Sequence, residues 1–520
     1  MVDLHTLPDS PEALKRLVIE LRGQIEHLKL QLAKLRRARF GQSSEQLKEA
    51  GQMALTLEAL HSVLSQVKDT ESPQTSATAE SEVREPPRRR KELPEHFPRE
   101  DNLIQPGCTG PECGGPLKAF GKPDTAEVLE VRTVTFTVTR HIRPKGRCAK
   151  CSTIVQAPAP PRPLEKSYAG ASVLAQVLHW KYGCHLPLYR QQQMFAQSGL
   201  VISRTTLMQW VGGSSQLLEP LADALGRYVL SAPSVHADDR PVKVLAPGTG
   251  KTKRGHLWTY VRDGHRWGST DPPATWYQYS PSWAGKYPQR HLAAFTGNLQ
   301  ADGYPGFNPL FEPSGPGRRA QVLEVACWAH ARRKVFDLYE AQHSPTAREA
   351  LERIKALYAI EDQIKGCSPE ERRAVRQEYA VPLLNALRSW MIEVVSQVER
   401  GSALAGALNY SLNQWDALMR YTDDGRLEID NSAAERSLRG VGTGRKNYMF
   451  FGADSGGERA AIIYSLIESC KLNHIDPQRY LEYVLRRIAE HPINRIEELL
   501  PWNVADQLGQ PDQVTQAMAA

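Results

Sequence analysis

Hydrophobic residues near the start of the chain recur every seven positions. Two interleaved series keep this spacing: Leu14, Leu21, Leu28 and Leu35, and between them Val18, Ile25 and Leu32. Leucine at one heptad position with mostly β-branched residues at the other favours a parallel two-stranded coiled coil. A single amphipathic helix packed on its own domain has the same spacing and is the alternative. We expect helices over residues 1–68 and dimerisation through them.

Residues 69–100 are poor in apolar groups and rich in Ser, Thr, Pro, Glu and Arg, which is typical of a disordered linker. Arg88, Arg89 and Arg90 lie within this linker. A basic run on a flexible strand binds DNA phosphates without sequence preference. A purely solubilising role for the linker remains open.

Two cysteine pairs bracket a strand-like stretch of alternating residues at 128–139. The pairs are Cys108 with Cys113, and Cys148 with Cys151. Four thiolates brought together by a hairpin form a tetrahedral zinc site, and zinc supplies folding energy to a unit with little core. We therefore expect a zinc-binding unit over residues 101–156. Reduced structural cysteines are the alternative, and the first pair departs from the commoner two-residue spacing.

Residues 164–230 follow a proline-rich segment and have a helical pattern. A helix near Leu188, a turn at Gly199 and a second helix capped by Ser203 have the shape of a helix-turn-helix. Polar residues of the second helix, Arg204 among them, could reach bases or phosphates. An ordinary helical hairpin is the alternative.

Residues 231–339 alternate between apolar and polar positions in several short runs, which predicts strands of a mixed α/β sheet. Asp238 lies within the first run, and Asp302 lies at the end of a later one. A helical pattern fills residues 340–420. Glu435 follows in residues 421–475, and residues 476–520 form a helical tail. We expect a core built from 231–339 and 421–475 with a helical insertion between its two parts.

Carboxylate oxygens are the preferred ligands of magnesium, so Asp238, Asp302 and Glu435 are candidate metal ligands. Each has an ordinary alternative: a strand-end Asp forms turns, and Ser432 with Glu435 fits a capping box. Arg and Lys side chains near Glu435 could clamp phosphates or pair with acidic neighbours; they are Arg436, Arg439, Arg445 and Lys446. His330 is expected to be structural.

The composition is that of a globular protein with a mildly basic surface. The chain has 65 basic and 58 acidic residues and a net charge of +7, which fits a nucleic-acid partner. No apolar run is long enough to span a membrane, and no signal peptide is apparent at the N-terminus. We expect a cytoplasmic, nucleoid-associated protein without a membrane partner.

Several motifs occur together in one order along the chain: 236–245, 299–304, 327–330, 430–436 and 444–447. In this order they resemble the insertion sequence 66 family of bacterial DDE transposases, over nearly the whole chain. The resemblance implies a ribonuclease-H-like core and a triad of Asp238, Asp302 and Glu435 holding two magnesium ions. Where the family usually has Glu-Thr after the first Asp, this chain has Asp239 and Arg240, so which aspartate faces the metals stays open.

The expected function is therefore that of a transposase. The resemblance implies binding of double-stranded DNA at the element ends and at the target, magnesium-dependent cleavage, and strand transfer. It also implies a homodimer or larger assembly and accessory proteins from the same element. Two alternatives remain: a catalytically silent DNA-binding regulator derived from such an element, and a nuclease without strand transfer.

Overall fold

The computed structural model describes residues 167–313 and 320–508, together with 162–165, the strands β1 (Lys145–Arg147) and β2 (Ile154–Gln156), and scattered residues between 10 and 28. The chain divides into two units, residues 1–42 with 141–520 and residues 43–140, and every described residue belongs to the first. Strands β1 and β2 pair antiparallel on either side of the second cysteine pair. The linker arginines and all four predicted zinc ligands lie outside the described residues.

A mixed sheet forms the centre of this unit, which confirms the prediction of a mixed α/β fold. Its order is β5-β4-β3-β6-β7. The strands are β3 (Ser234–Ala246), β4 (Lys251–Arg262), β5 (Ala274–Ser280), β6 (Gly297–Ala301) and β7 (Val322–Ala326). The first three pair antiparallel, whereas β6 runs parallel to both β3 and β7.

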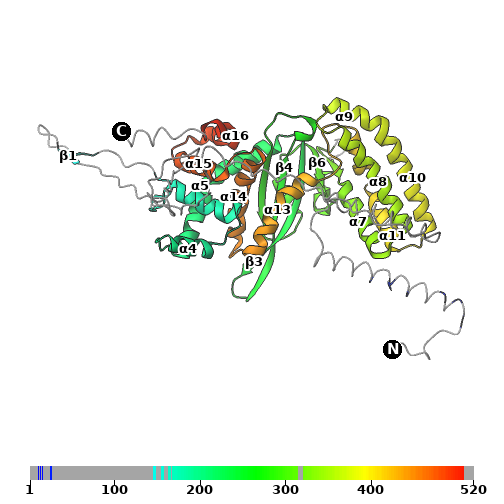
Figure 1. The fold of residues 1–520 in the computed structure, drawn as a ribbon, viewed down its shortest axis with the longest axis horizontal. Helices are drawn as coiled ribbons and strands as arrows, with labels where there is room; N and C mark the ends of the chain where they lie inside the picture. Colours follow the sequence, from blue (N-terminus) through cyan, green and yellow to red (C-terminus); the bar gives the residue numbers. More distant parts are fainter. Residues whose placement is uncertain are drawn as a thin grey trace, which may run out of the picture. The chain divides into compact units, whose positions relative to one another are not determined.

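The apolar runs of the strands are buried by helices on the sheet. Helix α5 (Arg204–Leu230) and helix α14 (Asp454–Leu472) pack on each other and against β5, while α13 (Ser432–Asn447) crosses β3 and β4 (Figure 1). Gly297 has a φ of +133°, and an added Cβ would lie 2.5 Å from the carbonyl oxygen of Pro233. Glycine is therefore required where β6 begins beside β3.

The predicted helix-turn-helix segment is helical as expected, and Ser203 caps the second helix by accepting a hydrogen bond from the Thr206 N–H. The second helix is α5, which continues for 27 residues. The other helices around it are α3 (Ala171–Leu178), a π-helical turn (His179–Gly183), α4 (Leu188–Gln197), α15 (Pro477–Arg487) and α16 (Pro501–Val504).

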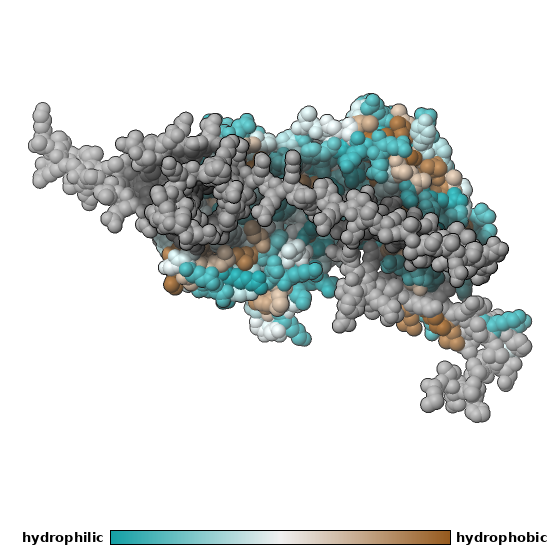
Figure 2. All heavy atoms as spheres, viewed as in Figure 1, coloured by the Kyte–Doolittle hydropathy of each residue, from teal (hydrophilic) through white to brown (hydrophobic). Residues whose placement is uncertain are grey.

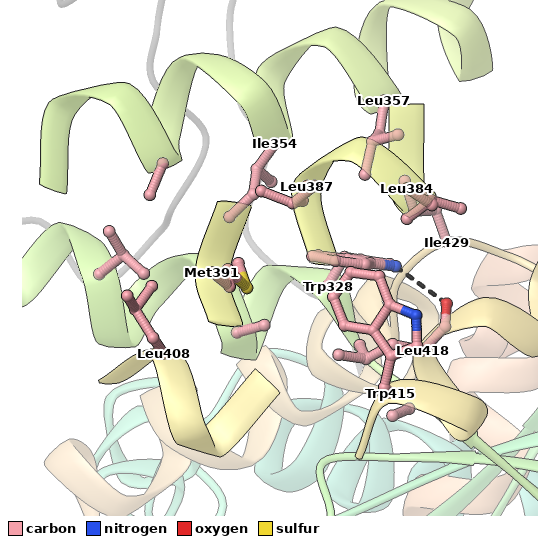
Figure 3. Close-up of a cluster of buried hydrophobic side chains, with 14 of the residues drawn as sticks. Trp328, Ile354, Leu357, Leu384, Leu387, Met391, Leu408, Trp415, Leu418 and Ile429 are labelled. Carbon is pink, nitrogen blue, oxygen red and sulfur yellow. Dashed lines mark hydrogen bonds between the residues drawn. The ribbon is translucent and has the colours of Figure 1, made fainter. Parts of the chain in front are cut away.

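The helices that follow β7 enclose a hydrophobic core of their own (Figure 3). They are α7 (Trp328–Gln342), α8 (Pro345–Gln363), α9 (Pro369–Val375), a π-helical turn (Arg376–Ala380), α10 (Val381–Gln397), α11 (Ala403–Asn413) and α12 (Trp415–Met419). Trp328 and Trp415 meet edge to face at 5.7 Å, and the Trp328 indole N–H donates to the carbonyl of Leu418 at 2.9 Å (Figure 3). The predicted helical stretch is thus a packed bundle.

Short segments complete the described chain: α6 (Lys286–His291) and the 3₁₀ turns His265–Trp267, Pro305–Leu310, Arg420–Thr422, Ile493–Leu499 and Ala505–Gln507. Hydrophilic and hydrophobic residues are interspersed on the visible surface, with a brown patch over the helices of the bundle (Figure 2). Among the described residues, no helix is long and apolar enough to cross a membrane.

Candidate active site

Asp238 and Asp302 are placed side by side by the pairing of β3 with β6. The pairing runs from Ser234 opposite Asn298 to His236 opposite Gln300. Each aspartate lies two residues beyond the last of these pairs, at the carboxyl end of the parallel part of the sheet. Gly303, with a φ of +78°, turns the chain away directly after Asp302. Two carboxylates therefore meet at one edge of the sheet.

Glu435 is brought to this edge by helix α13, where it lies in the first turn. The side chain of Asn431, just before the helix, donates to the carbonyl of Ala237 at 2.7 Å, next to Asp238 in the chain. Further along, the Ser437 hydroxyl lies 3.0 Å from that of Thr259, which pairs with Asp238 across β3 and β4. Two contacts thus fix α13 over the strand that carries Asp238.

The capping-box alternative for Glu435 is wrong. Ser432 is the first helical residue, Asn431 occupies the cap position without a side-chain cap bond, and the Ser432 N–H donates to Asp430 Oδ1 at 3.0 Å. Asn431 instead reaches β3, and its Oδ1 lies 3.1 Å from Nδ1 of His236. The Glu435 carboxylate is left facing His330, whose Nδ1 lies 3.7 Å from its Oε1. The structure therefore directs Glu435 away from a capping role.

The carboxyl groups at this edge make each other harder to ionise. Burial raises the pKa of Asp238 well above its ordinary value, and Asp302, Asp239 and Glu435 raise it further. Burial also raises the pKa of Asp302; Asp239 adds to this effect, and His330 opposes it. Like charges held close together disfavour the ionised form. Ionised carboxylates here would therefore repel one another, and His330 is the basic group that opposes this effect at Asp302.

Asp239 has different partners from Asp238. Its Oδ2 lies 2.5 Å from Nδ1 of His256, and its Oδ1 accepts from the Trp283 indole N–H at 2.9 Å. Successive strand residues point to opposite faces of a sheet. Asp238 shares its face with Thr259 and α13, whereas Asp239 points to the face of His256. Both oxygens of Asp239 are thus engaged by protein groups.

The donor chemistry of this edge fits magnesium. Among the residues that the structure describes, no three His, Cys, Asp or Glu side chains are arranged as ligands of one ion. Magnesium, however, takes only one or two carboxylates beside water and substrate phosphates. A divalent cation would relieve the carboxylate repulsion that, after burial, raises the pKa of Asp238 and of Asp302.

The predicted basic residues on α13 and α5 are all exposed, and two of them have polar partners within the chain. Arg436 lies 3.4 Å from Asp263, and Arg445 donates to the carbonyl of Pro241 at 2.6 Å. Arg439 and Lys446 are exposed on α13, and Arg204 is exposed at the start of α5. The four α13 residues therefore extend from Glu435 along one helix, while Arg204 belongs to a separate element.

The sequence interpretation missed a group of basic residues on the β3–β4 hairpin. The pKa of Arg445 is lowered by burial and then by Arg240 and Arg254, so these guanidinium groups lie close together. Lys243 and Arg254 are directly opposite in the two strands. Like charges opposite each other destabilise a sheet. The signal was the run from 243 to 254, in which basic strand residues flank a Pro-Gly turn.

The family model described as Transposase IS66 family matches residues 166–459. The chain belongs to the IS66 family of transposases. Three further IS66 models match: a C-terminal element at 465–502, a homeodomain-named segment at 27–101, and a zinc-finger binding domain at 108–152. The last match spans all four predicted zinc ligands and supports zinc binding by residues 108–152.

Relatives of this IS66 chain occur in Sinorhizobium fredii. Uncharacterized protein y4hP is 37% identical over 491 residues, covering 91% of this chain and 88% of that protein. Uncharacterized protein y4jD is 36% identical over 511 residues, covering 97% of this chain and 98% of that protein. A shorter match to uncharacterized protein YuaK of Escherichia coli is 40% identical over 48 residues, which are 9% of this chain and 51% of that protein.

Proposed function

We propose that this IS66-family chain is a DDE transposase that cuts DNA at the ends of its element and joins them to target DNA. The observation that carries the proposal is the convergence of Asp238, Asp302 and Glu435 on one edge of the sheet, from two strands and a distant helix. A sheet with three antiparallel strands followed by two parallel ones, in the order β5-β4-β3-β6-β7, supports a ribonuclease-H-like core.

Asp238, Asp302 and Glu435 are the residues that would hold two magnesium ions. When bound, such ions activate an attacking hydroxyl and stabilise the leaving oxygen in phosphodiester chemistry. The protein contributes the fixed positions of its carboxylates: Asn431 and Ser437 hold α13 on β3 and β4, and His330 faces Glu435. No covalent protein–DNA intermediate is required.

The basic surface of α13 and the hairpin supports a path for the DNA backbone. Arg439 and Lys446 are exposed along α13, and Arg240, Arg254 and Arg445 gather beside its far end. Phosphate contacts position a duplex without reading its sequence. We assign the reading of element ends to the helix-turn-helix with Arg204 and to the zinc unit with its four cysteines.

Dimerisation through the N-terminal helix is also part of the proposal. The described residues Leu21, Ile25 and Leu28 are helical and lie 46%, 51% and 62% exposed in the single chain. Apolar heptad positions left in water favour a second copy as their partner. A dimer would bring two element ends together. Accessory proteins of the same element remain a prediction from the family.

Strand transfer by the purified full-length protein tests the proposal. The assay combines a labelled duplex carrying the element's end, a target plasmid and magnesium, with Glu435→Gln beside the wild type. We expect the variant to lose joining by at least about 1,000-fold, equivalent to about 4 kcal/mol of transition-state stabilisation. Glu458→Gln, an exposed acidic position on α14, should join DNA like the wild type.

Each other outcome contradicts a defined part of the proposal. Joining by both wild type and Glu435→Gln would remove Glu435 from the triad. Specific binding of the element's end without cleavage by either protein would favour the silent regulator. Cleavage without joined product would indicate a nuclease.

A further inference from the structure

Trp283 lies on the surface beside the carboxylates and donates a hydrogen bond to Asp239. It belongs to the short loop between β5 and α6 and is 52% exposed. Large aromatic side chains stabilise a fold by being buried. By contrast, Trp258 beneath the same cluster is only 1% exposed and already fills the core there. Packing alone therefore does not account for an indole left half in water.

The Trp283 side chain is nevertheless held in one position. Its indole N–H donates to Asp239, and its backbone carbonyl accepts from the Tyr304 hydroxyl. Its ring stacks on that of Tyr304 with centroids 4.5 Å apart and on that of His256 at 6.0 Å. A surface aromatic fixed by these contacts is pre-organised, so a ligand that binds it loses little conformational entropy.

The two anchors of Trp283 belong to the chain segments that carry Asp238 and Asp302. Asp239 adjoins Asp238 in β3, and Tyr304 lies two residues after Asp302. Through these two contacts the exposed indole lies next to the segments of both aspartates. Four carboxyl groups act on one another here, so an anionic group would be repelled from this border. A flat, uncharged aromatic ligand would not be repelled.

We propose that Trp283 is a base-stacking platform that binds an unpaired nucleobase of the DNA strand beside the phosphate that is cut or joined. The inference rests on the proposed function, because it requires DNA at this edge. Bases stack on exposed aromatic side chains with little sequence preference, since every base has an aromatic face. Stacking would hold a frayed end open and so offset the unfavourable loss of pairing.

Binding of a fluorescent DNA extension tests this platform without any need for catalysis. The probe is a duplex with a short single-stranded 3′ extension that contains 2-aminopurine, compared with the same duplex ending blunt, in magnesium-free buffer without a chelator. Full-length wild type should prefer the extended duplex and quench the 2-aminopurine. Trp283→Leu should lose about 5- to 150-fold of affinity for the extension, the range for one stacked base, while blunt-duplex binding stays unchanged.

Trp283→Phe separates stacking from a merely structural role. Phenylalanine keeps an aromatic face but cannot donate to Asp239, so it should retain most of the quenching and preference that leucine loses. Equal loss in both variants would overturn the platform and leave Trp283 as a tether of Asp239. Tyr379→Leu, which removes another exposed aromatic, on the helical bundle, should behave as wild type.

Two further outcomes would also overturn the proposal. One is a wild type that binds blunt and extended duplexes equally, and the other is unchanged quenching by Trp283→Leu. The proposed function fails in a different experiment, when the wild type neither cuts nor joins DNA, and that result leaves the stacking measurement intact. Circular dichroism of each variant checks that it is folded.

Discussion

Two groups of buried charge in this protein are built in opposite ways. In the helical bundle, Arg376 Nη2 lies 2.6 Å from Glu361 Oε2, and Arg372 Nη1 lies 3.0 Å from Glu428 Oε1. Both guanidinium groups are almost completely buried. At the sheet edge, Asp238 and Asp302 meet further carboxyl groups, with His330 as their nearby basic group. One group compensates its charges within the chain, and the other does not.

The causes of the pKa shifts make the same distinction. Burial raises the pKa of Glu428, and the neighbouring Arg372 and Arg266 oppose this effect. At Asp238 the neighbouring carboxyl groups act in the same direction as burial. A buried ion is stable in a fold only when it is paired or binds a metal. Buried charge without a protein counterion is thus the feature that separates a binding site from a structural network.

The two groups are also connected. Gln300, in β6 just before Asp302, donates through its side-chain amide to the Glu428 carbonyl at 2.7 Å and accepts from the Glu428 N–H at 3.0 Å. Glu428 is held in turn by Arg372 and precedes the segment that leads into α13. The paired group therefore stabilises the chain segments that present Asp302 and Glu435.

The largest effect on stability is expected from breaking a buried Arg–Glu pair of the helical bundle. Arg376→Met should lower the free energy of unfolding by about 3–5 kcal/mol, because Glu361 loses its main counterion and stays buried. The carbonyls of Tyr421 and Leu427 lose a donor as well. Denaturant unfolding of the full-length protein measures the loss.

Arg353→Ala is the matched control for this prediction. Arg353 pairs with Glu349 at 2.8 Å on the surface of α8, and exposed pairs of this kind contribute about 0.3–0.5 kcal/mol. A loss for Arg376→Met no larger than for Arg353→Ala would contradict the structural role of the buried pair.

An intermediate effect on stability is expected from adding magnesium to the carboxylates around Asp238 and Asp302. Magnesium at about 100 times its dissociation constant should stabilise the wild type by about 2.7 kcal/mol, because it binds the folded state. Asp302→Asn should lose most of this gain, whereas Asp416→Asn, at an exposed position of α12, should keep it. Thermal unfolding with and without magnesium measures both. An equal gain in all three proteins would place the cation elsewhere.

The sequence was sufficient to predict features that depend on local pattern. Alternation located the strands around Asp238 and Asp302, and helical periodicity located the segment that contains Ile354. The paired group escaped prediction because Glu361, Arg372 and Glu428 have no regular spacing and meet only after the bundle folds. Trp283 escaped for a related reason, since its position depends on Asp239 and Tyr304 in two other segments. The roles of the triad rested on a family resemblance and not on local pattern.

The smallest effect is expected from relieving repulsion in the magnesium-free protein. In magnesium-free buffer at neutral pH, Asp302→Asn should be more stable than the wild type by about 0.5–2 kcal/mol, at the expense of activity. Because the folded-state pKa values of Asp302 and Asp238 are raised, the wild type has no penalty below the ordinary value of 3.8 and loses stability as pH rises through the folded values. The advantage of the variant should therefore grow from acidic to neutral pH. Denaturant unfolding across this range measures it. A variant less stable than the wild type at neutral pH would contradict this prediction. It would show that Asp302, like Glu428, stabilises the fold.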